Sequence, residues 1–424
     1  TYSAEVNYDF GNTTLTYLGA YLDTSVDLTM DFDRNDVLSD PLSVIVSSEQ
    51  WSHEIRWASN GNETFDWLVG GFYFDEAALR ATDIYITFGS GARLNSQTVQ
   101  PDFNVKSQAV FGQGTWHLSD AVDLVGGIRY TKDEKGEYGT FNRRQIDANP
   151  ATITTGDYKA DWDSTDWLLG VNWYPVANTL VYGKISTGYK SGGFNNVLAV
   201  STEGTEFKPE EILAYQIGHK SQFADNSVQL NSELFYYDYT DLQVNQLIDN
   251  VNYVRNAATA EIWGAETDLI WLATDSLMVN LGVSYLNATY YDFSQFSAVT
   301  RQEEDLDGST MARAPEFSGR LGLDYTIDTA GGWMFVPRVS FSWASDTKLT
   351  AFDDPGQLMK SWMRTDLSLD IVTPSGDWSA QFFLNNLEDD IVWSSGGVNG
   401  SGVRTLTARP PRMYGARLRY AFGS

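Results

Sequence analysis

A glycine-rich stretch at residues 186–196, STGYKSGGFNN, is the first part of the sequence whose residue types could do chemistry. It places Lys190 close to Gly192 and Gly193, as in loops that hold phosphate. A phosphate-binding P-loop needs a glycine directly before its lysine and a helix whose backbone amides face the phosphate. Here Tyr189 precedes Lys190, and no helical period follows. The stretch therefore does not predict a nucleotide site.

Histidine and cysteine are the next residue types to consider, because they supply most metal ligands and nucleophiles. The three histidines, His53, His117 and His219, share no spacing typical of metal ligands, and cysteine is absent. An isolated titratable residue needs a geometric partner before it can act in catalysis. We therefore expect no catalytic residue, no metal site and no cofactor, and we expect that the protein is not an enzyme.

A set of residues in polar segments combines charge with aromatic surface. Such side chains could hold an anionic ligand or stack on a sugar ring. The alternative is that they pack against the wall of the fold, and the residue types leave both interpretations open. The candidate ligand contacts are Tyr189, Lys190, Phe194, Asn195, Asn196, Arg255, Arg301 and Arg313.

The charge balance is strongly acidic. The chain of 424 residues carries 28 Lys and Arg against 56 Asp and Glu, a formal net charge of -28. This balance excludes nucleic acid as a partner, because phosphate backbones need basic surfaces. Acidic runs at residues 303–307, 353–354 and 388–390 are either solvated faces or sites for divalent cations.

The elements that must position these residues are strands. Side chains alternate between apolar and small or polar at every second position through residues 276–285, 317–327 and 363–371, which is the pattern of a sheet with two different faces. Many such segments reach ten residues, and a tilted strand needs about 9 to 11 residues to cross a bilayer. Aromatic residues make up 14% of the chain, and no apolar run is long enough for a membrane helix. The fold class is all-β, an antiparallel transmembrane β-barrel.

Short turns alternate along the chain with long polar loops, which include residues 89–100 and 134–155, as in outer-membrane barrels with turns on the periplasmic side. We count about 17 strands, and both the first and the last run from the outside inward. Complete bacterial barrels have an even number of strands and both ends in the periplasm. We therefore expect that residues 1–424 are the C-terminal portion of one barrel domain and that the N-terminal part is absent.

Six stretches in order resemble the barrel of TonB-dependent outer-membrane receptors. They are AVDLVGGIRYTKDEK, NTLVYGKISTGYKSGGFNN with FKPEEILAYQIGHKSQFADNSVQLNSELFYYDYTDLQV, NYVRNAATAEIWGAETDLIW, FFLNNLEDD and RPPRMYGARLRYAF. The resemblance implies a barrel of about 22 strands, with an N-terminal plug and a TonB-contacting segment upstream of Thr1. It also implies that the barrel assembly machinery reads the aromatic last strand, through Tyr414, Leu418, Tyr420 and Phe422.

The function implied by the resemblance is active uptake of a scarce solute across the outer membrane of a Gram-negative bacterium. A ferric siderophore or similar iron complex is the expected cargo, with an oligosaccharide or cobalamin as alternatives. The implied partners are TonB with its inner-membrane energising complex, the extracellular ligand, lipopolysaccharide, outer-membrane lipid and the assembly machinery. A passive porin, a barrel enzyme and a soluble all-β binding protein are the rival classes, and they predict an even strand count, clustered catalytic groups and a core between two sheets, respectively.

The reading frame upstream of Thr1 tests this interpretation. We expect it to encode a plug domain and about five further strands. Sequencing of the region would contradict the transporter interpretation if only a signal peptide precedes Thr1.

Overall fold

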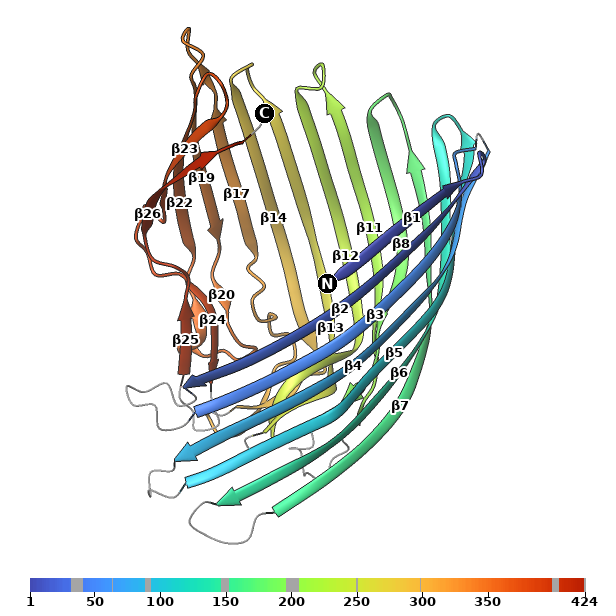
Figure 1. Cartoon of the computed structure of the whole chain (residues 1–424), viewed down its shortest axis with the longest axis vertical. Coiled ribbons are helices and arrows are strands. Elements are labelled where there is room, and N and C mark those ends of the chain that lie inside the picture. Colours follow the sequence, from blue (N-terminus) through green and yellow to red (C-terminus); the bar gives the residue numbers. More distant parts are fainter. Residues whose placement is uncertain are drawn as a thin grey trace.

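The computed structural model is a single antiparallel sheet that curves into a wall (Figure 1). The structure describes residues 1–31, 41–62, 64–87, 93–145, 152–195, 206–248, 251–297, 299–398 and 404–422. Within these ranges the large sheet has 18 strands, but β18 continues β17 along the same neighbour, so the chain makes 17 passes. The predicted fold class and strand number are confirmed. No helix in the described ranges is both long enough and apolar enough to cross a membrane.

The wall is an uninterrupted meander, in which each strand pairs with its neighbours in the sequence of passes. The first eight strands are β1 (Tyr2–Asp9), β2 (Thr13–Asp31), β3 (Pro41–Ser59), β4 (Phe65–Thr87), β5 (Arg93–Ser119), β6 (Val122–Gln145), β7 (Thr152–Trp173) and β8 (Thr179–Lys190). The others are β11 (Glu210–Phe223), β12 (Val228–Ile248), β13 (Val251–Leu272), β14 (Leu277–Tyr291), β17 (Phe317–Tyr325), β18 (Ile327–Asp328), β19 (Met334–Ala344), β22 (Trp362–Val372), β23 (Trp378–Asn385) and β26 (Met413–Tyr420).

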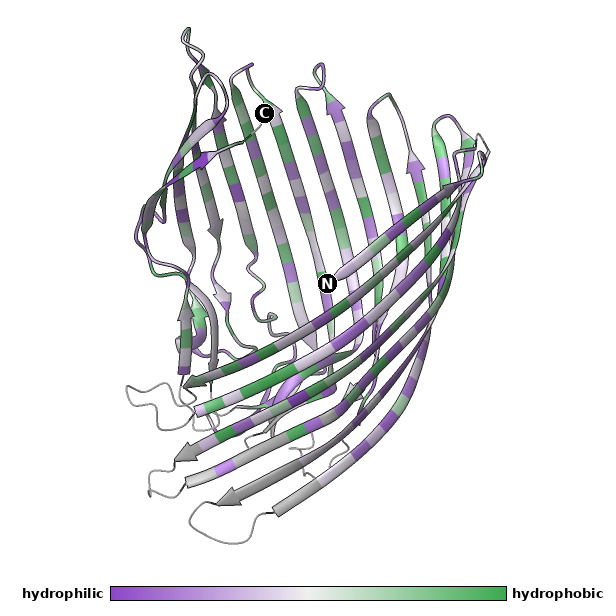
Figure 2. Ribbon diagram, viewed as in Figure 1, coloured by the Kyte–Doolittle hydropathy of each residue, from purple (hydrophilic) through white to green (hydrophobic). Residues whose placement is uncertain are grey.

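The two faces of the wall differ as the alternation predicts (Figure 2). One row of cross-strand neighbours joins Leu269, Leu281, Leu321 and Phe341 on the apolar face. The row beside it, on the other face, carries Asp268, Gly282, Arg320 and Ser342. An apolar exterior meets lipid and a polar interior faces the lumen in barrels of this kind.

Strand length is where the sequence-based expectation was wrong. Residues 134–145 and 93–100 were expected in loops, yet they extend β6 and β5, which pair as far as Leu94 and Gln145. Beyond the bilayer both faces of a strand meet water, so the alternation of apolar residues disappears while the backbone ladder continues. The 27 residues of β5 are far more than a bilayer crossing requires.

Pro337 interrupts the ladder locally. The break between β17 and β18 falls opposite this residue, because proline has no N–H to donate. The register is the same on both sides of the break, since Asp324 pairs with Arg338 and Ile327 with Phe335.

Four small hairpins and one turn of 3-10 helix fold over the long-loop end of the wall. They are β9 (Gly193–Phe194) with β10 (Glu206–Phe207), β15 (Ser294–Ser297) with β16 (Gln302–Asp305), β20 (Thr347–Lys348) with β21 (Leu358–Met359), β24 (Trp393–Val398) with β25 (Arg404–Ala408), and η1 (Pro355–Gln357). Two buried apolar clusters form beneath them, one around Phe293 and Leu306, the other around Leu349 and Met359. The hairpins are thereby fixed over the wall.

Neither margin of the wall is paired within the described residues. β1 hydrogen-bonds only to β2 there, and β26 only to β23. These two margins are therefore exposed edges of the sheet. Their unpaired backbone groups are costly in lipid.

The two faces generate a prediction for stability. Replacing Leu281 with Arg places a charge on the lipid side and should lower the free energy of unfolding by about 2–4 kcal/mol near the bilayer midplane. The matched variant Asn280→Arg projects into the lumen and should cost less than about 1 kcal/mol. Denaturant unfolding of the full-length protein in lipid vesicles measures both, and equal losses would contradict the assignment of the faces.

Candidate ligand-binding site

The glycine-rich stretch forms the outer end of β8 and the hairpin that follows. Phe194 stacks on Tyr158, with ring centroids 5.6 Å apart, and lies 6.0 Å from the ring of Trp162. Lys190 Nζ is 3.8 Å from the Glu210 carboxylate. Asn195 is buried, donates to the Val254 carbonyl and accepts from its N–H. These contacts hold the loop against β7, β11 and β13.

Gly192 and Gly193 stand where neighbouring groups come very close to the backbone. A Cβ on Gly192 would lie 2.4 Å from the Phe207 carbonyl oxygen and 2.6 Å from the indole of Trp162. Gly193 meets the ring of Phe207 at 2.6 Å in the same test. Glycine is therefore required by close approach rather than by backbone angle.

The predicted arginines are not gathered in one place. Arg255 lies half-buried on β13, and Arg301 is exposed in the turn between β15 and β16. Arg313 precedes β17 and donates its backbone N–H to the Lys348 carbonyl at 2.7 Å. Of the predicted contacts, Arg313 alone lines the two cavities described next, and Asn196 lies outside the described residues.

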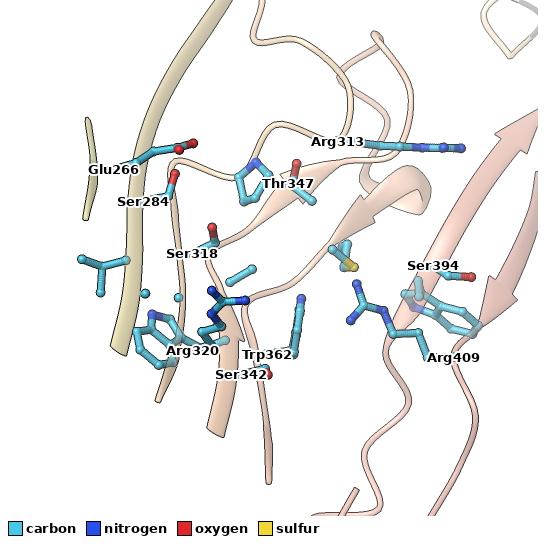
Figure 3. Close-up of a pocket in the computed structure, with 18 of the residues that line it drawn as sticks. Glu266, Ser284, Arg313, Ser318, Arg320, Ser342, Thr347, Trp362, Ser394 and Arg409 are labelled. Carbon is cyan, nitrogen blue, oxygen red and sulfur yellow. The ribbon is translucent and has the colours of Figure 1, made fainter. Parts of the chain in front are cut away.

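The first cavity lies between the lumenal face of β13 to β19 and the hairpins above it (Figure 3). Its volume is about 630 Å³. Three arginines and three tryptophans dominate the lining, against two carboxylates, Glu266 and Asp268. The arginines and tryptophans are Arg313, Arg320, Arg409, Trp343, Trp362 and Trp393.

A second cavity, of about 850 Å³, lies deeper among the hairpins. Its lining is rich in apolar and aromatic side chains, including Tyr290, Phe293 and Phe352. Arg313 and Leu349 line both cavities, so the two are neighbours in one site at the outer end of the wall. Both volumes fall within the range of about 300–1,000 Å³ that is typical of ligand pockets.

An ion pair joins two of the hairpins that border the second cavity, β20–β21 and β24–β25. Arg404 donates from Nε and Nη2 to the Asp354 carboxylate, at 2.6 and 3.0 Å. Asp354 also caps η1 by accepting from the Gly356 N–H at 3.0 Å. The hydrogen bond from Arg404 holds the pKa of the Asp354 carboxyl below its usual range. Behind this pair, the buried Gln357 donates to the Gly397 carbonyl.

The remaining acidic runs and two of the histidines, His53 and His117, have structural partners. Glu388 accepts from the backbone N–H of Thr365, and Asp305 accepts from the N–H of Asp307. His117 lies between Asp66, at 3.0 Å, and Asp123, at 2.7 Å. Across the described residues, no three His, Asp or Glu side chains are grouped as metal ligands.

Sequence analysis did not select most of this site. Trp362, Arg404 and Arg409 are far apart from the glycine-rich stretch and have no motif around them, except that Arg409 opens the terminal block RPPRMYGARLRYAF. They meet only because the hairpins fold over the lumen.

A long antiparallel meander with an apolar exterior, a polar interior and a loop-built site at one end is the architecture of an outer-membrane barrel. Residues 1–387 match the family described as TonB dependent receptor-like, beta-barrel. The chain belongs to this family. The match places the chain in the β-barrel of the TonB-dependent receptors.

Individual relatives are distant in sequence. The pesticin receptor of Yersinia pestis is 24% identical over 303 residues, which are 70% of this chain and 41% of that protein. The probable TonB-dependent siderophore receptor PiuA of Acinetobacter baumannii is 24% identical over 237 residues, 54% of this chain and 30% of that protein. This chain therefore spans less than half the length of these relatives.

A solved structure shows the same fold. The ferric yersiniabactin uptake receptor FyuA from Yersinia pestis superimposes with a TM-score of 0.83 at 18% identity. The match covers 99% of this chain and 61% of that one. The wall of 17 passes is thus the fold of part of a TonB-dependent receptor.

The ion pair of Asp354 and Arg404 generates a prediction at neutral pH. Asp354→Asn removes the charge that holds Arg404, so trypsin should cleave after Arg404 several-fold faster. Asp353→Asn is the matched control, since Asp353 pairs with Lys348 instead. Mass spectrometry of the peptides reads out both variants, and equal cleavage rates in wild type and Asp354→Asn would show that the pair does not restrain the hairpin.

The same pair predicts a pH dependence. The folded pKa of Asp354 is lowered, so its stabilising contribution is complete above the unfolded value of about 4 and is lost as pH falls through the folded value. The distance between spin labels on the two hairpins should lengthen in this acid range and stay constant at higher pH. An unchanged distance at low pH would contradict the assignment.

Proposed function

We propose that the full-length protein takes up a ferric siderophore or similar iron complex across the outer membrane, with energy supplied through TonB. The observation that carries this proposal is the pair of adjoining cavities at the outer end of the wall, lined by arginine and tryptophan. Relatives named as a siderophore receptor and a ferric yersiniabactin receptor support the cargo class. Exposed arginines and aromatic rings suit a chelate with oxygen donors and ring systems.

The seven predicted contacts that lie within the described residues divide into three groups under this proposal. Arg313 contacts the cargo directly, because it lines both cavities. Phe194 and Asn195 keep the rim in place through their packed contacts, and Tyr189, Lys190, Arg255 and Arg301 stay candidates for first contact with cargo at the rim.

The proposed partners follow from family membership and from the surface. TonB and its inner-membrane energising complex act through a segment upstream of this chain. The apolar exterior contacts outer-membrane lipid, and the acidic outer end lies at the level of lipopolysaccharide. The barrel assembly machinery recognises β26 and the residues that follow it. Tyr414, Leu418 and Phe422 are strongly exposed there.

The extent of the domain is also a proposal. Further strands, about five in number, join the exposed edge of β26 to that of β1, and a plug fills the lumen. This arrangement satisfies the backbone groups that the wall leaves unpaired at its margins.

An oligosaccharide is the second candidate cargo. Trp362 and Trp393 in the first cavity favour it, because indole rings stack on sugar faces. Cobalamin remains an alternative without a specific observation in its favour. A passive porin is disfavoured by membership of a TonB-dependent family.

Uptake of radioactive iron tests the proposal. Cells that carry the full-length gene should accumulate iron from a supplied siderophore, and cells that lack either this gene or TonB should lose about tenfold or more of the rate. Labelled maltooligosaccharide is the parallel arm. Uptake of the sugar but not of iron would overturn the iron proposal and favour the second candidate.

A further inference from the structure

Two buried polar atoms at the first cavity have no hydrogen-bond partner among the described residues. They are the hydroxyl Oγ1 of Thr347 and the indole Nε1 of Trp362, and both residues line the cavity. Thr347 is only 5% exposed. Buried polar groups in folded proteins almost always have a hydrogen-bond partner, so two such groups without a partner beside one cavity need an explanation. The indole N–H can only donate, and the hydroxyl can donate as well.

Positive charge is concentrated beside these donors. The guanidinium of Arg409 lies over the Trp362 ring, 4.6 Å from its centroid, and Arg313 borders the same cavity. Figure 3 shows the Trp362 indole between the guanidinium groups of Arg320 and Arg409 in this view. Arg320 is held by Asp268 at 3.1 Å, whereas no carboxylate in the described ranges pairs with Arg313 or Arg409.

This concentration runs against the composition of the chain. Carboxylates outnumber cationic side chains by 56 to 28 overall, yet three arginines face two carboxylates in this cavity. Arg320 and Asp268 neutralise each other. The positive charges of Arg313 and Arg409 are then opposed only by the carboxylate of Glu266 among the residues that line the cavity. The local field therefore attracts an anion in a protein that otherwise repels one.

The side of the first cavity that lies behind these two donors is apolar. Leu349, Met359 and Val392 form a buried cluster, with Trp362 and Trp393 packed against it. Apolar surroundings have a low dielectric constant, which strengthens a hydrogen bond made beside them. This side of the cavity also offers a flat surface to a ring that carries the anionic oxygens.

We propose that Arg409, Trp362 Nε1 and Thr347 Oγ1 form a subsite for the anionic oxygens of an aromatic chelating group, a carboxylate or phenolate on a planar ring. The oxygens accept from the guanidinium, the indole N–H and the hydroxyl, while Arg313 attracts the rest of the charge. This inference deepens the proposed uptake function and rests on it for the identity of the cargo. It predicts that the protein selects anionic aromatic chelates over neutral ones.

The test uses full-length receptor purified in detergent and three probes. They are the ferric complex of 2,3-dihydroxybenzoate, which is anionic and aromatic, a neutral ferric trihydroxamate, and iron-free 2,3-dihydroxybenzoate. Arg409→Gln removes the charge, Trp362→Phe keeps a ring and loses the N–H, and Thr347→Val keeps the shape and loses the hydroxyl. Arg417→Gln is the matched control, since Arg417 also lies over an aromatic ring, Phe383, but outside this cavity.

Calorimetry should show that each of the three cavity variants weakens binding of the anionic complex by about tenfold. Thr347→Val should keep the wild-type thermal stability, because the deleted hydroxyl has no hydrogen-bond partner among the described residues of the free protein. Trp362→Phe and Arg409→Gln also remove packing beside the Leu349 cluster, so their binding of the neutral complex is the control for the fold. Binding of the neutral complex should not change, and Arg417→Gln should bind both complexes as wild type does.

The outcomes separate this inference from the proposed function. If wild type binds the anionic and neutral iron complexes alike and Arg409→Gln changes neither, the subsite is overturned and iron-complex binding stands. If only iron-free 2,3-dihydroxybenzoate binds, and Arg409→Gln abolishes that binding, the subsite stands and the iron cargo fails. Loss of stability in Trp362→Phe and Thr347→Val without loss of binding would assign the two side chains to the fold alone.

Discussion

Every part of this molecule depends on the need to pair backbone N–H and C=O groups where no water can reach them. In a bilayer this need permits only helices and closed ladders of strands. The long antiparallel meander meets it for every strand between β1 and β26, whose outer edges stay unpaired among the described residues. Because the same ladder forces side chains to alternate, the row Leu269, Leu281 and Leu321 faces lipid while Arg320 and Asp268 face the lumen. The division between an apolar exterior and a polar interior is thus a consequence of backbone pairing.

The ladder also sets where a ligand can bind. The strands continue well past the bilayer, and the hairpins fold back over their ends, where the buried clusters around Phe293 and Leu349 fix them. The ion pair of Asp354 with Arg404 joins two of these hairpins. Cavities large enough for a ligand form between the hairpins and the wall. The site therefore combines side chains from loops with side chains from the strands of the sheet.

The sequence predicted those features that a repeating physical constraint produces. The alternation at residues 276–285 identified the lipid face of β14, and the even spacing of turns led to the 17 passes. The outer ends of β5 and β6 were missed because alternation vanishes where both faces are wet. Arg409 and Trp362 were missed for a different reason, since their contact joins the residues before β26 to the start of β22 and no local pattern encodes it.

The proposed uptake requires that the arginine and tryptophan cavity under the hairpins receive an anionic iron complex. An experimental structure of the full-length receptor, soaked with the ferric complex of 2,3-dihydroxybenzoate and measured at the iron absorption edge, is a direct test of this requirement. We expect an anomalous iron peak in the cavity bordered by Arg313 and Arg409, with a ligand oxygen in hydrogen-bond reach of Trp362 Nε1. A peak elsewhere in the lumen, with that nitrogen still unpaired, would contradict it.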